Sequence, residues 1–274
     1  MGQACGGGRN HGTEDTFYVV ETGFQIPVRT VIKMGWKPDH PDLRPAEHFP
    51  LYDQGSLGSC TANAIGAAFH FDQVKQGIHD FTPSRLFLYY NERRMEITPG
   101  DADADNGACI RDGLKSMVKI GMCKEPLWPY TESAFKDNPT KDCYEQAAKN
   151  RGLRYARVPQ QLESMKACIN EGLPFVFGFT VYSSFFSNAT RVSGHMTMPQ
   201  EIDTVAGGHA VMAIGYDDAK KVFIVRNSWG DTWADKGYFY MPYHYITQAC
   251  LVSDIWVIKN IAATPFPTKS IMEG

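Results

Sequence analysis

The stretch 53–64 constrains the fold of this chain more than any other. It reads Asp-Gln-Gly-Ser-Leu-Gly-Ser-Cys-Thr-Ala-Asn-Ala, a glycine-broken turn that runs directly into small residues. We expect a helix from Cys60 to about Gln76, ended by Gly77, because glycine readily adopts the left-handed conformation that closes a helix. Ser59 is the expected N-cap. This arrangement places Cys60 in the first helical turn.

The position of Cys60 suggests a reactive thiol. The unpaired N–H groups and the partial positive charge at the start of a helix favour a thiolate over a thiol. The side-chain amide of Gln54 and the backbone N–H of Cys60 are expected to point into the same space, where two donors form an oxyanion hole. A lone cysteine on an alanine-rich helix is also typical of a small buried hydrophobic residue, so the interpretation depends on partners elsewhere in the chain.

Composition excludes several classes of function. The chain has 274 residues, of which 43% are hydrophobic, and a net charge of -3. This length allows a sizeable core in one two-lobed domain, and the charge does not favour nucleic acid or an anionic membrane as an obligatory partner. No apolar run is long enough for a transmembrane span. The N-terminus has no hydrophobic signal core, which predicts that the chain is not secreted.

The first residues also resemble a lipidation signal only weakly. Gly2 and Cys5 stand where N-myristoylation and palmitoylation occur, but Gly6 occupies the position at which the motif has Ser or Thr. We therefore expect an unmodified N-terminus.

The cysteines and the acidic loop do not predict a metal centre or any other cofactor. Seven cysteines are scattered without a Cys-x-x-Cys pair, which argues against a zinc ribbon and predicts mostly reduced thiols. The loop 101–107 resembles a calcium loop in its first three carboxylates. Its glycine falls one place late, however, and Asp112 stands where a calcium loop has Glu. A solvated acidic turn is the expected structure.

The pattern of the chain changes from helical to β near residue 152. Two further helices are expected in the first part, at 84–95 and 109–120. After residue 152, runs with period-two alternation and β-branched residues predict strands, and one helix is expected among them at 160–171. The predicted strands are 154–158, 175–181, 209–216, 221–226, 237–241 and 255–258. The expected fold class is α+β, with a helical lobe against an antiparallel, barrel-like β lobe and a cleft between them.

Two segments of the β part supply partners for Cys60. His209 begins a strand after the turn Gly207-Gly208, and Asn227 ends the next strand, where it is followed by Ser-Trp-Gly. In an antiparallel hairpin the amide oxygen of Asn227 can reach one ring nitrogen of His209, which leaves the other nitrogen to face Cys60. Nucleophile, base and orienting group then come from three segments. Trp229 is expected to cover the His209–Asn227 bond and to exclude water.

With these three segments identified, the chain resembles the papain family of cysteine peptidases. The matching motifs are Gln-Gly-x-x-Gly-Ser-Cys at 54–60, Gly-His-Ala-Val at 208–211 and Asn-Ser-Trp-Gly-x-x-Trp at 227–233. The resemblance implies a two-lobed fold and a protease without cofactor. It also implies site residues: Cys60 as nucleophile, His209 as acid and base, Asn227 as orienting group, Gln54 and Cys60 as oxyanion donors, and Gly58, Gly208, Ser253 and Asp254 as substrate contacts.

The resemblance further implies how the chain is divided. Residues 1–35 correspond to a short prosegment in the cleft, 36–150 to the helical lobe and 151–274 to the β lobe. Thr61 stands where most members have Trp, and Leu57 where plant and animal members have a disulfide cysteine, which fits a bacterial or giant-virus branch. We expect a monomeric endopeptidase, made as a zymogen, that acts on protein or peptide substrates. Its expected location is intracellular or in a virion.

Two other functions remain open at this stage. The first is a catalytically silent papain-like scaffold that serves as a binding or virion protein. The second is an acyltransferase or ligase that uses the same Cys-His chemistry but transfers the acyl group to an amine. Retention of Cys60, His209 and Asn227 argues against the first of these.

Overall fold

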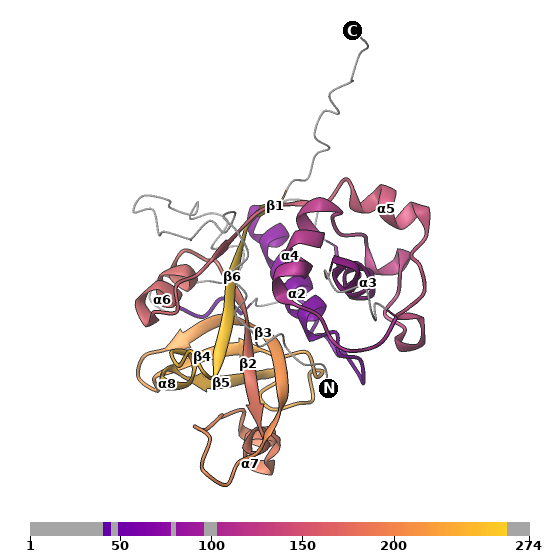
Figure 1. Cartoon of the computed structure of the whole chain (residues 1–274). Coiled ribbons are helices and arrows are strands. Elements are labelled where there is room, and N and C mark those ends of the chain that lie inside the picture. The colour runs from indigo at the N-terminus through magenta and orange to yellow at the C-terminus, as the bar shows by residue number, and fades with distance from the viewer. Residues whose placement is uncertain (1–40, 45–48, 78–80, 96–102, 262–274) are drawn as a thin grey trace.

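The computed structural model describes residues 41–44, 49–77, 81–95 and 103–261. The expected prosegment 1–35 and the lipidation positions lie outside these residues. Figure 1 shows the helices α2, α3, α4 and α5 gathered on one side of the molecule and the strands on the other. Among the described residues, no helix is both long and apolar enough to cross a bilayer.

Helix α2, Cys60–Gln76, is the central element of the helical side, and its predicted bounds are confirmed. It ends at Gly77, which has φ 65° and donates its N–H to the carbonyl of Val74 at 3.1 Å. Residues on every face of α2 are buried, because it packs against α3 and α4 on one side and against strands of the sheet on the other. This two-sided burial explains why its first half consists largely of small residues.

The other helices of this side are short. They are α3 (Arg85–Met95), α4 (Ile110–Lys119), the 3-10 helices η1 (Glu125–Leu127) and η2 (Glu132–Ala134), and α5 (Lys141–Ala147). The two predicted helices begin one residue later than expected. Ser84 acts as the cap of α3, since its hydroxyl accepts the N–H of Phe87 at 3.1 Å. Helix α5 was not predicted, because seven residues carry too little periodicity to be distinguished from a turn.

Six strands form one antiparallel sheet in the order β1-β6-β2-β3-β4-β5. They are β1 (Gly152–Arg157), β2 (Phe175–Tyr182), β3 (Val205–Asp217), β4 (Val222–Arg226), β5 (Tyr238–Pro242) and β6 (Val252–Ile261). All six expected runs are strands, and the α+β class is confirmed. Strands β1 and β5 form the two edges, and no ladder joins them in the described part of the chain, so the sheet is not a hydrogen-bonded closed barrel.

In the described part of the chain, four helices belong to the β side. They are α6 (Leu162–Asn170), η3 (Ser183–Phe186), α7 (Asn188–Ser193) and α8 (Tyr243–Ile246). Helix α6 was predicted, and it packs on β2 and β3. Helix α7 was not predicted; its cap is Ser187, whose hydroxyl accepts the N–H of Thr190 at 3.2 Å.

The described segment 41–44 belongs spatially to the β side. Leu43 donates its N–H to Ile214 at 2.9 Å, and the carbonyl of Pro41 accepts the N–H of Tyr216 at 2.9 Å. Gly215 permits this approach, since a Cβ there would lie 2.8 Å from the Pro41 oxygen. The start of the expected helical lobe therefore crosses onto the sheet, and the division into lobes at 36–150 and 151–274 remains our proposal.

Candidate active site

A cavity of about 510 Å³ brings together most of the expected site residues. Its walls come from the loop 53–58, the first residue of α2, the start of β3 and the segment after β4. Six expected site residues line it: Gln54, Gly58, Cys60, Gly208, His209 and Trp229.

Cys60 is the first residue of α2 and is 7% exposed. No acidic side chain of α2 lies in its first turn, so the partial positive charge at the start of the helix is not offset from within the helix. Burial nevertheless raises the pKa of the Cys60 thiol to about 11, with the backbone of Ala210 acting in the opposite direction. The buried thiol therefore needs a partner that takes its proton.

Ser59 occupies the N-cap position of α2 as expected, but its side chain makes no capping hydrogen bond. Its hydroxyl instead lies 2.5 Å from the hydroxyl of Tyr130 and accepts the side-chain N–H of Asn63 at 3.0 Å. These partners compete for the hydroxyl, and they fix the residue directly before Cys60 from two sides.

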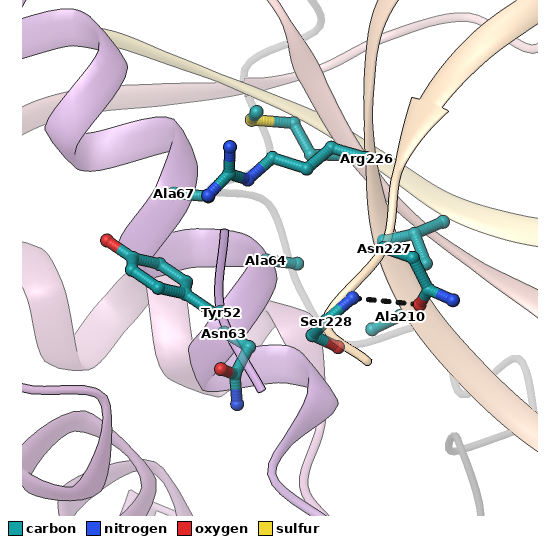
Figure 2. Close-up of a pocket in the computed structure, with 10 residues that line it drawn as sticks. Tyr52, Asn63, Ala64, Ala67, Ala210, Arg226, Asn227 and Ser228 are labelled. Carbon is teal, nitrogen blue, oxygen red and sulfur yellow. Dashed lines mark hydrogen bonds between the residues drawn. The ribbon is translucent and has the colours of Figure 1, made fainter. Parts of the chain in front are cut away.

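His209 and Asn227 are joined by a hydrogen bond. Nε2 of His209 lies 2.8 Å from Oδ1 of Asn227, which also accepts the N–H of Ser228 at 2.9 Å, the bond drawn in Figure 2. The hairpin accounts for this contact, because Asn227 directly follows β4, and β4 pairs with β3 at Arg226 and Met212. The bond occupies Nε2 and leaves Nδ1 of the ring for a second partner.

The imidazole of His209 is enclosed by aromatic rings. Trp229 stacks on it with ring centroids 5.0 Å apart at 25°, and Phe179 meets it at 5.8 Å and 64°. Phe186 in turn stacks on Trp229 at 5.8 Å. His209 is only 5% exposed, and this burial lowers its pKa to about 4. A positive charge on the ring consequently requires a nearby negative charge.

Gln54 is held in place by the segment that carries Asn227. Its backbone N–H donates to the carbonyl of Ser228 at 2.9 Å, and its Oε1 accepts the hydroxyl of Ser228 at 2.6 Å. Nε2 of Gln54 donates to Leu57 at 2.9 Å, and an amide nitrogen has a second hydrogen to donate. Ser228 was not predicted as a site residue, because its contact with Gln54, 174 positions away, leaves no local signal in the sequence.

Asp105 anchors the loop that carries Gly58. The N–H of Gly58 donates to both carboxylate oxygens of Asp105, at 2.9 and 3.0 Å, and the hydroxyl of Tyr89 donates to the same group. The part of the expected acidic turn that the structure describes is therefore not simply solvated. A Cβ on Gly58 would lie 3.1 Å from the backbone N of Gly107, which explains the glycine at this position.

We predict that Asp105→Ala destabilises the protein by about 1–3 kcal/mol, because it leaves a backbone N–H and a tyrosine hydroxyl without their acceptor. The looser loop should also reduce kcat/KM for peptides by about tenfold. Urea unfolding and steady-state kinetics measure the two effects. The matched control is Asp103→Ala, which removes an exposed ion pair with Arg94 and should change stability by less than about 1 kcal/mol. Equal effects of the two substitutions would contradict the assignment.

Arg226 connects the two sides of the molecule beside the site. Figure 2 shows its side chain extending from the strand toward Ala67 of α2, across a small interior cavity. Its guanidinium donates to the carbonyl of Pro50 and lies 4.3 Å from the ring of Phe49. Arg226, which directly precedes Asn227, therefore holds residues 49–50, the segment that leads into the loop of Gln54.

Ser253 and Asp254, the expected contacts of the second subsite, are not among the described residues that line the cavity. Ser253 pairs with Gly178 of β2 and is exposed. Asp254 accepts the indole N–H of Trp256 at 3.1 Å and lies 3.5 Å from the guanidinium of Arg157. The carboxylate is therefore already partnered outside this cavity, and recognition of basic side chains by Asp254 is not supported by the geometry.

Most cysteines of the described residues are free thiols. Within the described ranges, no cluster of three or more His, Cys, Asp or Glu side chains is arranged to hold a metal ion. Among these residues five cysteines are free, namely Cys60, Cys123, Cys143, Cys168 and Cys250, in line with the expectation of mostly reduced thiols. Cys109 is disulfide-bonded.

Comparison with known proteins identifies the family. Residues 37–259 match the papain family cysteine proteases. A peptidase C1-like protein of Acanthamoeba polyphaga mimivirus is 43% identical over 76% of this chain and 69% of its own length. Cysteine proteinase 1 of Entamoeba histolytica is 31% identical over 70% of this chain and 59% of its own length.

The same result comes from solved structures. Xylellain, a cysteine protease from Xylella fastidiosa, superimposes with a TM-score of 0.78 at 40% identity, over 89% of this chain and 91% of that one. Procathepsin B S9 from Trypanosoma congolense shares the fold at 15% identity with a TM-score of 0.63. Sequence and fold agree over most of the chain, and the protein belongs to the papain family of cysteine proteases.

Proposed function

We propose that this protein is an endopeptidase in which Cys60 is the nucleophile, His209 the acid and base, Asn227 the orienting group and Gln54 an oxyanion donor. The observation that carries the proposal is the single cavity lined by Cys60, Gln54 and a His209 whose Nε2 is bonded to Asn227. Three segments far apart in the sequence converge there with complementary chemistry.

The proposed reaction proceeds in two stages. In the first, Nδ1 of His209 takes the proton of the Cys60 thiol, and the sulfur bonds to the substrate carbonyl carbon. The carbonyl oxygen becomes negative and is stabilised by the N–H of Cys60 and by Nε2 of Gln54. The carbon–nitrogen bond then breaks, His209 returns its proton to the leaving amine, and a thioester remains on Cys60.

In the second stage, water hydrolyses the thioester. His209 takes a proton from the water as its oxygen bonds to the carbonyl carbon, and the carbon–sulfur bond breaks. The acid product leaves, and the Cys60 thiolate and the protonated His209 remain as the pair that starts the next cycle. No cofactor is needed, because the side chains supply both the nucleophile and the proton transfers.

Burial makes the two charges of this pair interdependent. Separately, the thiol has a pKa raised to about 11 and the imidazole a pKa lowered to about 4, so each charged form is unfavourable alone. When a proton moves from sulfur to ring, the two charges attract each other in a site from which water is excluded, and this attraction offsets the cost of burial. Thiolate and imidazolium therefore form together.

We predict that Cys60→Ser lowers the pKa of His209 to about 4, because serine supplies no negative charge to balance the buried imidazolium. The wild-type imidazolium should persist to higher pH. Nitrogen chemical shifts of the histidine ring, followed by NMR against pH, measure the difference. The exposed His195 is the internal control, and its ring signals should not differ between the two proteins at any one pH. An identical His209 titration in both would mean that the two side chains are not coupled.

We further propose that residues 1–35 act as a prosegment that covers the cleft until it is removed. The resemblance to cysteine proteases with a short prosegment supports this. A relative in a mimivirus likewise supports an intracellular or virion-associated setting.

The experiment that tests both parts is labelling with a peptidyl epoxide, followed by intact mass and peptide mapping, before and after incubation at mildly acid pH. Because Cys250 is free and exposed, a Cys250→Ala background removes the competing thiol. Single labelling of Cys60 only after loss of the N-terminal segment is the expected result. Labelling without cleavage would overturn the prosegment proposal, and no labelling of Cys60 under either condition would overturn the catalytic one.

A further inference from the structure

Arg191 supplies a cationic side chain to the cleft, and no Lys and no other Arg is among the described residues that line it. Among the described residues that line the cavity, the ionisable groups are Asp53, Cys60, His209 and Arg191. Arg191 belongs to α7, a helix that the sequence did not predict, and its side chain is exposed. The lining also includes apolar and aromatic side chains, among them Phe186 and Trp233.

The backbone of Arg191 is fixed while its guanidinium is not paired. Its N–H donates to the carbonyl of Ser187 at 3.0 Å, and its carbonyl accepts the N–H of Ala234 at 3.0 Å. No hydrogen bond or ion pair joins its side chain to another residue in the part of the chain that the structure describes. Asp53 shares the cavity, but its carboxylate accepts the N–H of Gly55 at 2.9 Å and makes no ion pair with Arg191. The guanidinium is thus available to a ligand.

The position of Arg191 relative to His209 indicates which part of a substrate it meets. The leaving amine departs on the side of His209, because this ring returns the proton to it. Trp229 stacks on His209, and Phe186 stacks on Trp229 at an interplanar angle of 17°. Helix α7 begins two residues after Phe186, so Arg191 extends the same wall. A leaving peptide on the His209 side of the cleaved bond would therefore meet these residues of the cavity lining.

We propose that Arg191 selects substrates that carry a carboxylate on the C-terminal side of the cleaved bond. This inference rests on the proposed function. A guanidinium binds a carboxylate through two parallel N–H donors, and the aromatic wall beside it reduces competition from water. The carboxylate belongs either to an Asp or Glu side chain in the leaving part or to the free C-terminus of a short leaving peptide.

The test uses internally quenched peptides that share one sequence on the N-terminal side. The first and second leaving residues are Glu, Gln or Lys in peptides with an amidated C-terminus, and a neutral peptide is made as free acid and as amide. We expect kcat/KM to be about three- to tenfold higher for Glu than for Gln, the range typical of a partly screened ion pair. A preference for the free acid over the amide, without a Glu preference, would assign the interaction to the C-terminus instead.

Variants connect the preference to Arg191. Arg191→Gln should abolish the preference by lowering kcat/KM for the Glu peptide to the value for the Gln peptide, Arg191→Lys should keep part of the preference, and Arg191→Glu should favour Lys peptides. The matched control is Arg154→Gln on β1, which removes an exposed arginine that is not among the described residues lining the cavity. Active-site titration with the epoxide normalises every rate. Hydrolysis without any carboxylate preference, or a preference that survives in Arg191→Gln, overturns this inference alone, whereas no hydrolysis of any peptide by titratable enzyme overturns the proposed function with it.

Discussion

Cys60→Ala is expected to lower kcat/KM for peptide hydrolysis by about 10⁴-fold or more, because Cys60 carries the only thiol among the described residues that line the cavity. The substitution removes one buried sulfur atom from the start of α2. The backbone N–H of residue 60, the proposed oxyanion donor, remains. A fluorogenic peptide measures the loss, and circular dichroism with thermal unfolding verifies that the protein is folded.

The control for this prediction is Cys250→Ala. Cys250 is also free, but it is exposed and lies outside the residues described as lining the cavity, so its loss should leave kcat/KM unchanged within about twofold. Activity of Cys60→Ala within tenfold of the wild type would overturn the assignment of the nucleophile. Loss of activity in both variants would point to a general sensitivity of the fold to cysteine replacement.

His209→Ala is expected to reduce kcat/KM by about 10²- to 10⁴-fold, since it removes the group that accepts and returns the proton. It should also change the chemistry of the thiol. Without an imidazole to take its proton, Cys60 is left with the pKa of about 11 that burial imposes, and the thiolate forms only in strongly alkaline solution. In the wild type, the paired thiolate should react at neutral pH and below.

Alkylation by a small neutral reagent measures the thiolate directly. In a Cys250→Ala background, the rate at Cys60 should rise only toward pH 11 in the His209→Ala protein and be nearly constant around neutral pH in the wild type. The matched control is His195→Ala, which removes an exposed histidine that stacks on Tyr240 and should alter neither rate. The same pH dependence in wild type and His209→Ala would mean that His209 does not take the proton.

The elements that the sequence predicts well have local causes. Helix α2 begins and ends as expected because the turn before Cys60 and the glycine at Gly77 act on their immediate neighbours. The strands are predicted for the same reason, since runs of β-branched and aromatic residues are a local signal. The His209–Asn227 bond follows from one hairpin, which needs only the register of two adjacent strands.

The features that were missed depend on contacts between distant segments. Ser59 is a good N-cap by residue type, but Tyr130 and Asn63 take its hydroxyl in the folded protein. The acidic loop was expected to be a solvated turn because its carboxylates are close in sequence, whereas Asp105 accepts the N–H of Gly58, 47 residues away. Asp254 was placed by family resemblance near the second subsite, and its pairing with Arg157 on another strand had no local signal.

The bonds between Gln54 and Ser228 also have a consequence for how the protein loses activity. The backbone N–H of Gln54 donates to the carbonyl of Ser228, and the hydroxyl of Ser228 donates to the side chain of Gln54. Both bonds lie next to Asn227, which is bonded to His209. A fluctuation that separates the two sides would break the oxyanion donor and the oriented base in one event, while both halves keep their own secondary structure. On heating, inactivation should thus precede the loss of the circular dichroism signal, so that catalysis serves as a sensor for the docking of the two halves.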